Sequence, residues 1–240
     1  MVCAPAAPET TLAAAENLLI ARLPLTDRRR LTAACEVVRV ELGSTLHQAG
    51  DPLLAAHFPI DAFFSLVAVV DGHPGLEVGM VGREGMVGVQ LALGASHTPV
   101  RVLVQGSGRA LSITAPALDM ELARSAPLRR TLAAYVDGVM RELAVSAACM
   151  RFHLIGPRLA RWLLMTRDRA GSDRFAITHE FLALMLGVRR AGVTGAADTL
   201  RARGLIAYRR GAMQIVDPAG LEAVACSCYR PPAREDNAPR

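Results

Sequence analysis

Arginine side chains gather near the end of the chain, where residues 189–210 carry six of them. A guanidinium group binds phosphate or carboxylate oxygens through its planar set of N–H donors. Arg190, Thr194 and Arg201 fall on one side of a predicted helix, turned away from its apolar positions. The outward side is cationic and the other side is not, so we predict a surface for a polyanion. The alternative is an ordinary helix with solvated arginines.

Two helices joined by a short break position these arginines. The first begins after Thr178, a predicted N-cap, and ends at Gly187, because glycine adopts the left-handed conformation at little cost. The second spans about 189–203, and two strand-like runs follow it around Arg210-Gly211. Helix, turn, helix and hairpin form the plan of a winged helix-turn-helix, whose second helix enters the DNA major groove. The alternative is a helical hairpin packed on a small sheet.

The five cysteines are scattered and odd in number, which argues against a disulfide framework. Cys226-Ser-Cys228 is their one cluster. Two interpretations stay open: two ordinary thiols near the chain end, or part of a metal or redox site. A zinc site needs further Cys or His ligands. The sequence alone therefore assigns no metal and no cofactor.

Motifs that would indicate an enzyme are missing from the sequence. It has no nucleophile elbow and no phosphate-binding glycine loop, and its six histidines are dispersed. We therefore expect no catalytic residues and no enzymatic activity.

Charge is distributed unevenly along the chain. Residues 151–240 hold 15 Arg and 8 Asp or Glu, whereas residues 1–150 hold 12 Arg and 14 Asp or Glu. A basic half is typical of a phosphate-binding surface. The chain is 52% apolar, yet no apolar run approaches the ~20 residues of a membrane span. The start is acidic, unlike a signal peptide, so we expect a cytoplasmic protein without membrane contact.

Short runs of Val, Leu and Phe fill the segment from about Val37 to Ile113. Glycines interrupt them at intervals of roughly 8–12 residues, which predicts a compact antiparallel β-roll or barrel.

A long helix is predicted from Ser125-Ala126-Pro127 onward, broken at Gly156-Pro157. A seam of residues steps along it by four and three positions, as in a coiled coil: Leu132, Val136, Val139, Leu143, Ser146 and Met150. The seam predicts a dimer interface. The alternative is a single buried core helix with no partner.

These elements predict an α+β chain of three parts. We expect an N-terminal β-roll domain over 1–124, a dimerisation helix and hinge over 125–155, and a winged helix-turn-helix domain over 156–240.

This order of elements resembles the Crp/Fnr family of bacterial transcription regulators. The resemblance covers roughly Val37 to Tyr229 and is strongest over residues 175–211, F-x-I-T-H-E-F-L-A-L-M-L-G-V-R-R-x-x-V-T…L…G-L-I-x-Y-x-R-G. It implies a cyclic-nucleotide-binding-like β-roll, a homodimer joined through the long helix, and a near-palindromic double-stranded DNA operator. RNA polymerase is a further candidate partner, although no motif marks a surface for it.

The resemblance also implies roles for single residues. Arg190 falls where the family usually places a base-reading arginine. Arg189 stands where Ser or Thr is common, Ala191 where many members carry Glu, and Gly195 where many carry Arg. The operator is therefore expected to differ from the common family sequence. The candidates for phosphate contacts are Thr178, Thr194, Arg201, Arg209 and Arg210.

The N-terminal part departs further from the family. Members that bind cyclic nucleotides use a Gly-Glu pair for the ribose and an Arg-Ser pair for the cyclic phosphate. The corresponding positions here read Gly88-Val89 and Thr98-Pro99, and Arg101 need not point inward. Without those charges the phosphate has no counter-ion, so we predict that cyclic nucleotide binding is lost. Arg83-Glu84 is interpreted as an exposed charge pair, with a site for another small ligand as the alternative.

The predicted function is a sequence-specific DNA-binding transcription regulator acting as a homodimer, with helix 189–203 in the major groove. The alternative is a small-ligand sensor or regulatory subunit that works through the β-roll and a protein partner. That alternative leaves the arginines of 189–210 without a role.

Overall fold

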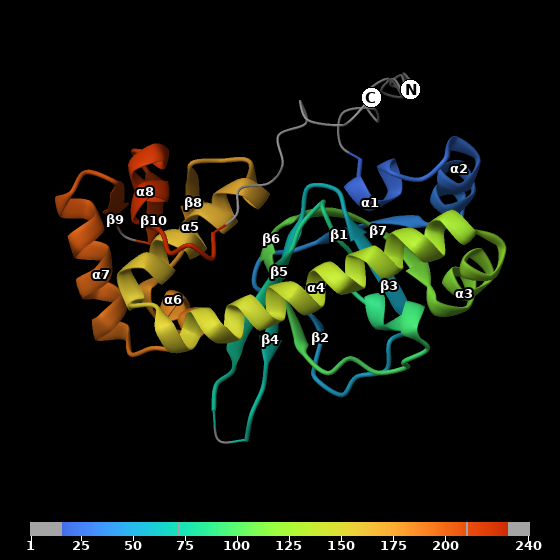
Figure 1. Cartoon of the computed structure of the whole chain (residues 1–240), viewed down its shortest axis with the longest axis horizontal. Helices are drawn as coiled ribbons and strands as arrows, with labels where there is room; N and C mark the ends of the chain where they lie inside the picture. Colours follow the sequence, from blue (N-terminus) through green and yellow to red (C-terminus); the bar gives the residue numbers. More distant parts are fainter. Residues whose placement is uncertain (1–15, 72, 210, 230–240) are drawn as a thin grey trace, which may run out of the picture.

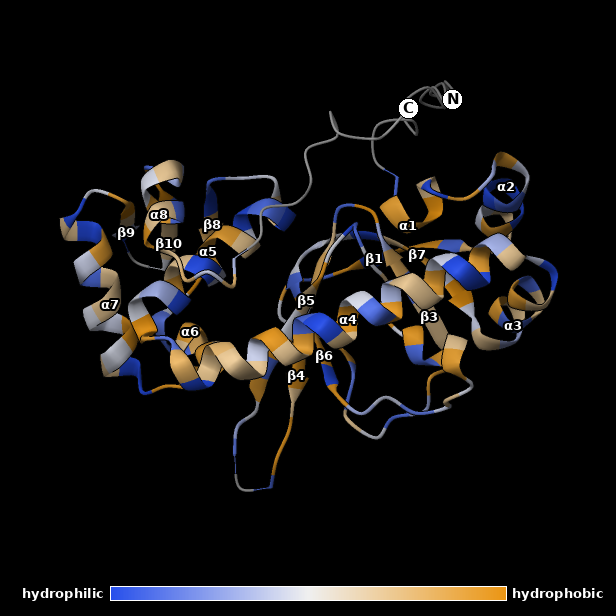
Figure 2. Cartoon of the chain, in the orientation of Figure 1, coloured by the Kyte–Doolittle hydropathy of each residue, from blue (hydrophilic) through white to orange (hydrophobic). Residues whose placement is uncertain are grey.

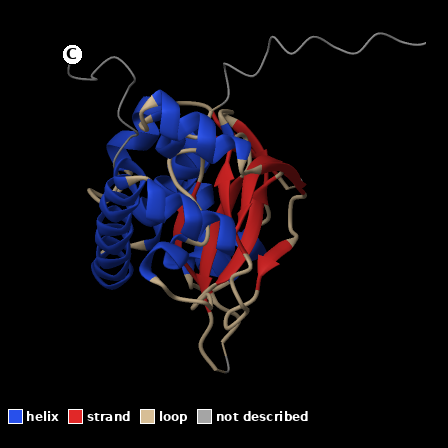
Figure 3. Ribbon diagram, turned by 90° about the vertical axis from the view of Figure 1, so that its right-hand side faces the viewer, coloured by secondary structure: helices blue, strands red, loops and turns tan. Residues whose placement is uncertain are grey.

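The N-terminal half of the chain is a β-roll, as predicted. The structure is a computed structural model that describes residues 16–71, 73–209 and 211–229. Two antiparallel sheets form the roll, with strand orders β1-β7-β3 and β2-β6-β4-β5. Seen from the roll end, the strands gather on one side and the helices on the other (Figure 3). The strands are β1 (Glu36–Val40), β2 (Thr45–His47), β3 (Ala55–Pro59), β4 (Phe63–Ala68), β5 (Leu76–Val81), β6 (Arg101–Gly106) and β7 (Gly108–Thr114).

The chain passes from one sheet to the other between β6 and β7. A Cβ atom on Gly108 would lie 2.6 Å from the backbone nitrogen of Ala62. Glycine at position 108 therefore lets the start of β7 approach the backbone of Ala62 closely. The interior of the roll is apolar and includes Phe58, Phe64 and Val104, all nearly inaccessible to solvent.

Short helices cover the roll, and one long helix leaves it. In Figure 1 the long helix α4 runs across the whole molecule, from the roll to the C-terminal domain. The helical elements of this part are α1 (Leu18–Ala21), α2 (Leu25–Ala33), the 3-10 helix η2 (Val89–Leu93), α3 (Ala115–Arg124) and α4 (Ala126–Phe152).

The break after α4 lies earlier than the sequence pattern suggested. His153 and Leu154 separate α4 from α5 (Ile155–Ala170). Gly156-Pro157, the predicted break, falls in the first turn of α5. Proline is tolerated there, because the first backbone N–H groups of a helix have no partner inside it.

The C-terminal domain packs three helices and a three-stranded sheet around α5. The sheet has the order β8-β10-β9. The core of the domain includes Trp162, Leu182 and Leu200. Its elements are β8 (Arg174–Ala176), α6 (His179–Leu186), α7 (Arg190–Ala202), β9 (Ile206–Arg209), β10 (Ala212–Ile215) and α8 (Pro218–Val224).

Polar contacts connect α5 to the roll. The indole nitrogen of Trp162 donates to Oε1 of Glu77 at 2.8 Å. Arg169 forms an ion pair with Glu84, N to O 2.7 Å. Glu84, which the sequence suggested as part of an exposed charge pair, is a partner of α5. None of the helices in the described ranges is long and apolar enough to cross a bilayer.

Candidate nucleic-acid interface

The helix pair α6–α7 has the boundaries that the local signals predicted. The Thr178 hydroxyl accepts from the backbone nitrogen of Phe181 at 3.1 Å and so caps α6. Gly187 ends that helix with φ 62°. Arg189 occupies the N-cap position of α7 and makes no side-chain capping bond. The first-turn N–H groups of α7 are therefore not covered by its own cap residue.

Helix α7 places its apolar side inward and its cationic side outward. Val193, Ala197 and Leu200 are buried against the rest of the domain. Arg189 and Arg190 are exposed, and neither side chain makes a hydrogen bond or ion pair with any residue in the described ranges. In Figure 1, α7 runs along the outer edge of the molecule, at the end farthest from the roll. Both arginines are therefore exposed, and Arg189 also lines a hollow between the start of α7 and the β4–β5 hairpin of the roll.

The other predicted contact residues have varied surroundings. Arg201 is exposed and pairs with Asp198 one turn earlier, N to O 2.9 Å. Such an exposed pair is worth little and is easily exchanged for another anion. Arg209 is exposed at the end of β9. Arg210 lies outside the described residues.

Thr194 is half-buried, and its hydroxyl is already bonded within the domain. It donates to the backbone oxygen of Arg190 at 3.1 Å and lies 3.0 Å from Nδ1 of His179. The His179 ring stacks on Tyr208, with ring centres 4.3 Å apart. Burial lowers the pKa of His179; Asp198 opposes this effect and Arg190 adds to it. The His179 side chain therefore connects α6, α7 and β9.

Sequence reasoning missed this role of His179, which it treated as an ordinary histidine. Its partners are 15 and 29 positions away, and no pattern in the sequence predicts these contacts. Tyr208 pairs with Met213 in the sheet and packs against His179.

Two of the six positions in the seam predicted along α4 are buried within the chain. Leu132 is 1% exposed in the core of the roll, and Ser146 is 7% exposed. The dimer interface along α4 stays a prediction. Helix α4 carries a neighbouring apolar face, which shares Val136 and Leu143 with the predicted seam and is shifted by one residue elsewhere. We call this face the α4 stripe: Ala133, Val136, Met140, Leu143 and Ala147. Val136 is half-buried, Met140 is 66% exposed and Leu143 is 40% exposed. In Figure 2 the C-terminal half of α4 is mainly hydrophobic in colour.

The positions that the resemblance assigns to a cyclic nucleotide contain no charge here. Val89 and Thr98 are both buried. The Thr98 hydroxyl donates to the backbone oxygen of Val100 at 2.9 Å. Arg101 donates to the backbone oxygen of Pro74 at 3.3 Å, toward the β4–β5 hairpin. The loss of cyclic nucleotide binding stays a prediction that these contacts support.

The fold and this surface define a class: a β-roll joined by a long helix to a winged helix-turn-helix. Residues 157–224 match the family model of the Crp-like helix-turn-helix domain. The C-terminal domain therefore belongs to that family of domains, and the predicted class of DNA-binding transcription regulator is confirmed.

Solved structures extend the likeness over most of the chain. A transcriptional regulator of the Crp/Fnr family from Eubacterium rectale has 17% identity and a TM-score of 0.69, over 87% of this chain and 98% of its own. A CRP-family transcriptional regulator from Thermus thermophilus has 18% identity and a TM-score of 0.69, over 81% and 100%. The c-di-GMP-responsive global regulator CLP of Xanthomonas campestris has 18% identity and a TM-score of 0.67, over 80% and 99%.

At these identities the likeness shows the fold, so the chain has the fold of Crp/Fnr regulators. The resemblance stated from residues 175–211 is confirmed in this respect. No curated protein matches the chain in sequence.

Proposed function

We propose that the chain binds double-stranded DNA sequence-specifically as a homodimer, with α7 in the major groove. One observation carries the proposal most directly. Arg190, the first residue of α7, is exposed and makes no bond to any described carboxylate. A free guanidinium on an exposed helix suits the paired acceptors O6 and N7 of guanine.

The small residues of α7 support a close approach to DNA. Ala191 and Gly195 lie on the exposed side of the helix, and a Cβ on Gly195 would have nothing within 4 Å. Base edges can therefore come close to the backbone of α7. The N-terminal end of a helix also carries partial positive charge, which attracts phosphate.

The remaining candidates divide by their expected task. We assign Arg190 to base recognition. Arg189, Arg201 and Arg209 are assigned to phosphate groups, because they are exposed at the N-cap of α7, in its last turn and in the hairpin that follows. Thr178 retains its hydroxyl proton for a phosphate oxygen while its oxygen caps α6. Thr194 is reassigned to holding α7 in place, since its hydroxyl is bonded inside the domain.

We propose the α4 stripe as the dimer contact. Its residues step by three and four positions, so they form one face of the helix. Exposed Met140 and Leu143 gain free energy when a second copy covers them. Two copies related by a two-fold axis then present two α7 helices to a near-palindromic operator.

The salt dependence of DNA binding tests this function. Affinity for duplex DNA from a random pool should fall linearly on a log–log plot as salt rises, because each neutralised phosphate releases counter-ions. Arg209→Ala should reduce the slope by about one unit. Arg39→Ala is the matched control, because Arg39 is an exposed arginine on β1 of the roll. Binding without salt dependence, or no binding at all, would contradict the proposal and favour a partner other than DNA.

A further inference from the structure

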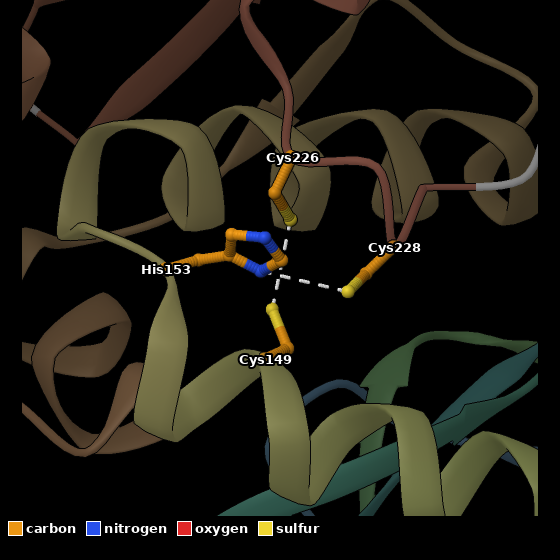
Figure 4. A group of neighbouring side chains, drawn as sticks. All are labelled: Cys149, His153, Cys226 and Cys228. Atoms are coloured by element: carbon orange, nitrogen blue, oxygen red, sulfur yellow. Dashed lines mark hydrogen bonds between the residues drawn. The ribbon is translucent and has the colours of Figure 1, made fainter.

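Four potential metal ligands meet where α4 ends. Cys149 and His153 lie four residues apart at the C-terminal end of α4, and Cys226 and Cys228 directly follow α8. Figure 4 shows their side chains directed to a common centre from two separate segments. The four ligand atoms, three Sγ and one imidazole nitrogen, all lie within 4.8 Å of one another. The sequence pattern had identified only the second pair.

The separations between these atoms suit a shared ion. Sγ of Cys149 lies 3.6 Å from Sγ of Cys226, and Sγ of Cys228 lies 3.6 Å from Nδ1 of His153. Tetrahedral zinc has Zn–S bonds of about 2.3 Å and Zn–N bonds of about 2.0–2.1 Å, which place neighbouring ligands ~3.6–3.8 Å apart. A disulfide bond would require about 2.05 Å between the two sulfur atoms.

Backbone hydrogen bonds hold the two segments in this arrangement. His153 is the C-cap of α4, and its N–H donates to the oxygen of Cys149 at 3.1 Å. The N–H of Cys226 donates to the oxygen of Pro157 in the first turn of α5 at 3.2 Å. Tyr229 then closes the segment, because its hydroxyl donates to Asp168 at 3.0 Å. The ligand positions are therefore set by the fold.

Burial and charge also favour a bound cation. Cys149 is 1% exposed and Cys226 is 6% exposed, so a metal there is shielded from water. Arg158 interacts electrostatically with both of these thiols, and Arg161 does so with Cys149. Three thiolates and a neutral imidazole around a dication leave one net negative charge. The two arginines offset that charge.

We propose that Cys149, His153, Cys226 and Cys228 bind one Zn²⁺ in a closed Cys3His site. Thiolate and imidazole ligands together favour zinc over hard cations such as magnesium. Four protein ligands leave no open position, so the ion is structural. It connects the end of the long helix to the end of the helix-turn-helix domain, across the break at His153-Leu154. The thiol protons are released when the metal binds.

Metal binding by the full-length chain tests the site, and this test does not depend on DNA binding. The reduced chain is loaded with Zn²⁺, freed of excess ion and analysed for metal content. One equivalent of zinc per chain is expected. Co²⁺ in place of zinc should give the intense visible d–d and thiolate charge-transfer bands of a tetrahedral thiolate site. A chelator should remove the ion and lower the thermal midpoint reversibly.

Two variants make the assignment specific. Cys228→Ser removes a half-buried ligand near the surface, so the chain is expected to fold while losing the stoichiometric zinc and the cobalt bands. Cys35→Ser is the matched control, because Cys35 is a free thiol elsewhere in the chain, and it should keep both. No retained metal in the reduced wild-type chain would overturn the proposal. So would undiminished binding in Cys228→Ser, or an isolated chain with a Cys149–Cys226 disulfide and no capacity for zinc after reduction.

Discussion

His179 holds the start of the proposed recognition helix to its surroundings. Its ring bonds Thr194 on α7 through Nδ1 and stacks on Tyr208 of β9. The Thr194 hydroxyl donates to the oxygen of Arg190, so its oxygen is left to accept from Nδ1 of His179. One side chain of α6 thus fixes both the helix that carries Arg190 and the hairpin that carries Arg209.

Glycine at position 195 is expected to weaken α7. Replacing glycine by alanine inside a helix stabilises it by about 1 kcal/mol when the new methyl group has room. The Cβ of Gly195→Ala would have nothing within 4 Å, so the midpoint of denaturant unfolding should rise. Gly187→Ala is the opposite case, because φ is 62° and its Cβ would lie 2.6 Å from Leu76. A lower unfolding midpoint for Gly195→Ala, or a higher one for Gly187→Ala, would refute this packing.

Acid should destabilise the roll through His57. Burial lowers the pKa of His57 to about 4, and the nearby His47 adds to the effect. Between pH 6.5 and about 4 the unfolded chain binds a proton at this residue and the folded chain does not. The contribution of neutral His57 to the free energy of unfolding is therefore complete above pH 6.5. It falls by roughly 3 kcal/mol in total as the pH is lowered to about 4.

Chemical denaturation across this pH range, comparing the wild-type chain with His57→Gln, measures the effect of His57. The variant should lose stability less steeply between pH 6.5 and 4. His73→Gln, which changes an exposed histidine, should follow the wild-type slope. Equal slopes for all three proteins would show that His57 is accessible to protons in the folded state.

At the scale of elements, local signals predicted the helix-turn-helix and distant contacts corrected the rest. Thr178 and Gly187 set the ends of α6 through bonds to near neighbours, so the sequence was sufficient there. The α4 seam was ambiguous, because the predicted series and the α4 stripe both step by three and four. Only the packing of Leu132 into the roll selects between them. The contact between Cys226 and Cys149, which are 77 positions apart, could not be predicted from the sequence either.

The α4 stripe makes a prediction that the original seam does not. Met140→Glu places a charge at the centre of the stripe, so it should convert a dimer to monomers without unfolding the chain. Sedimentation velocity measures the mass, and circular dichroism reports the fold. Val37→Glu is the control, because Val37 is a similarly exposed residue on β1. A Met140→Glu protein that stays dimeric would exclude the stripe as the contact.

At the scale of the whole molecule, the DNA-binding domain is joined to the roll in two ways. Helix α5 docks on the roll through Trp162–Glu77 and Arg169–Glu84. The apolar core of the domain also continues into the roll through Val67 and Met80. The proposed zinc site joins the C-terminal end of α4 to the segment that follows α8. The orientation of α7 is therefore set by the roll and by α4 together, which suits a regulator whose two copies must match one operator.

The base preference of the Arg190→Ala variant tests the central claim most directly. Duplexes selected from a random pool by the wild-type chain define the operator, and every single base-pair change is then measured with both proteins. The account predicts that Arg190→Ala loses preference at one base pair in each half-site, symmetric about the centre, by about 1–3 kcal/mol. Preferences at the other positions should persist. An unchanged profile, or an equal loss for all sequences, would contradict the placement of α7 in the major groove.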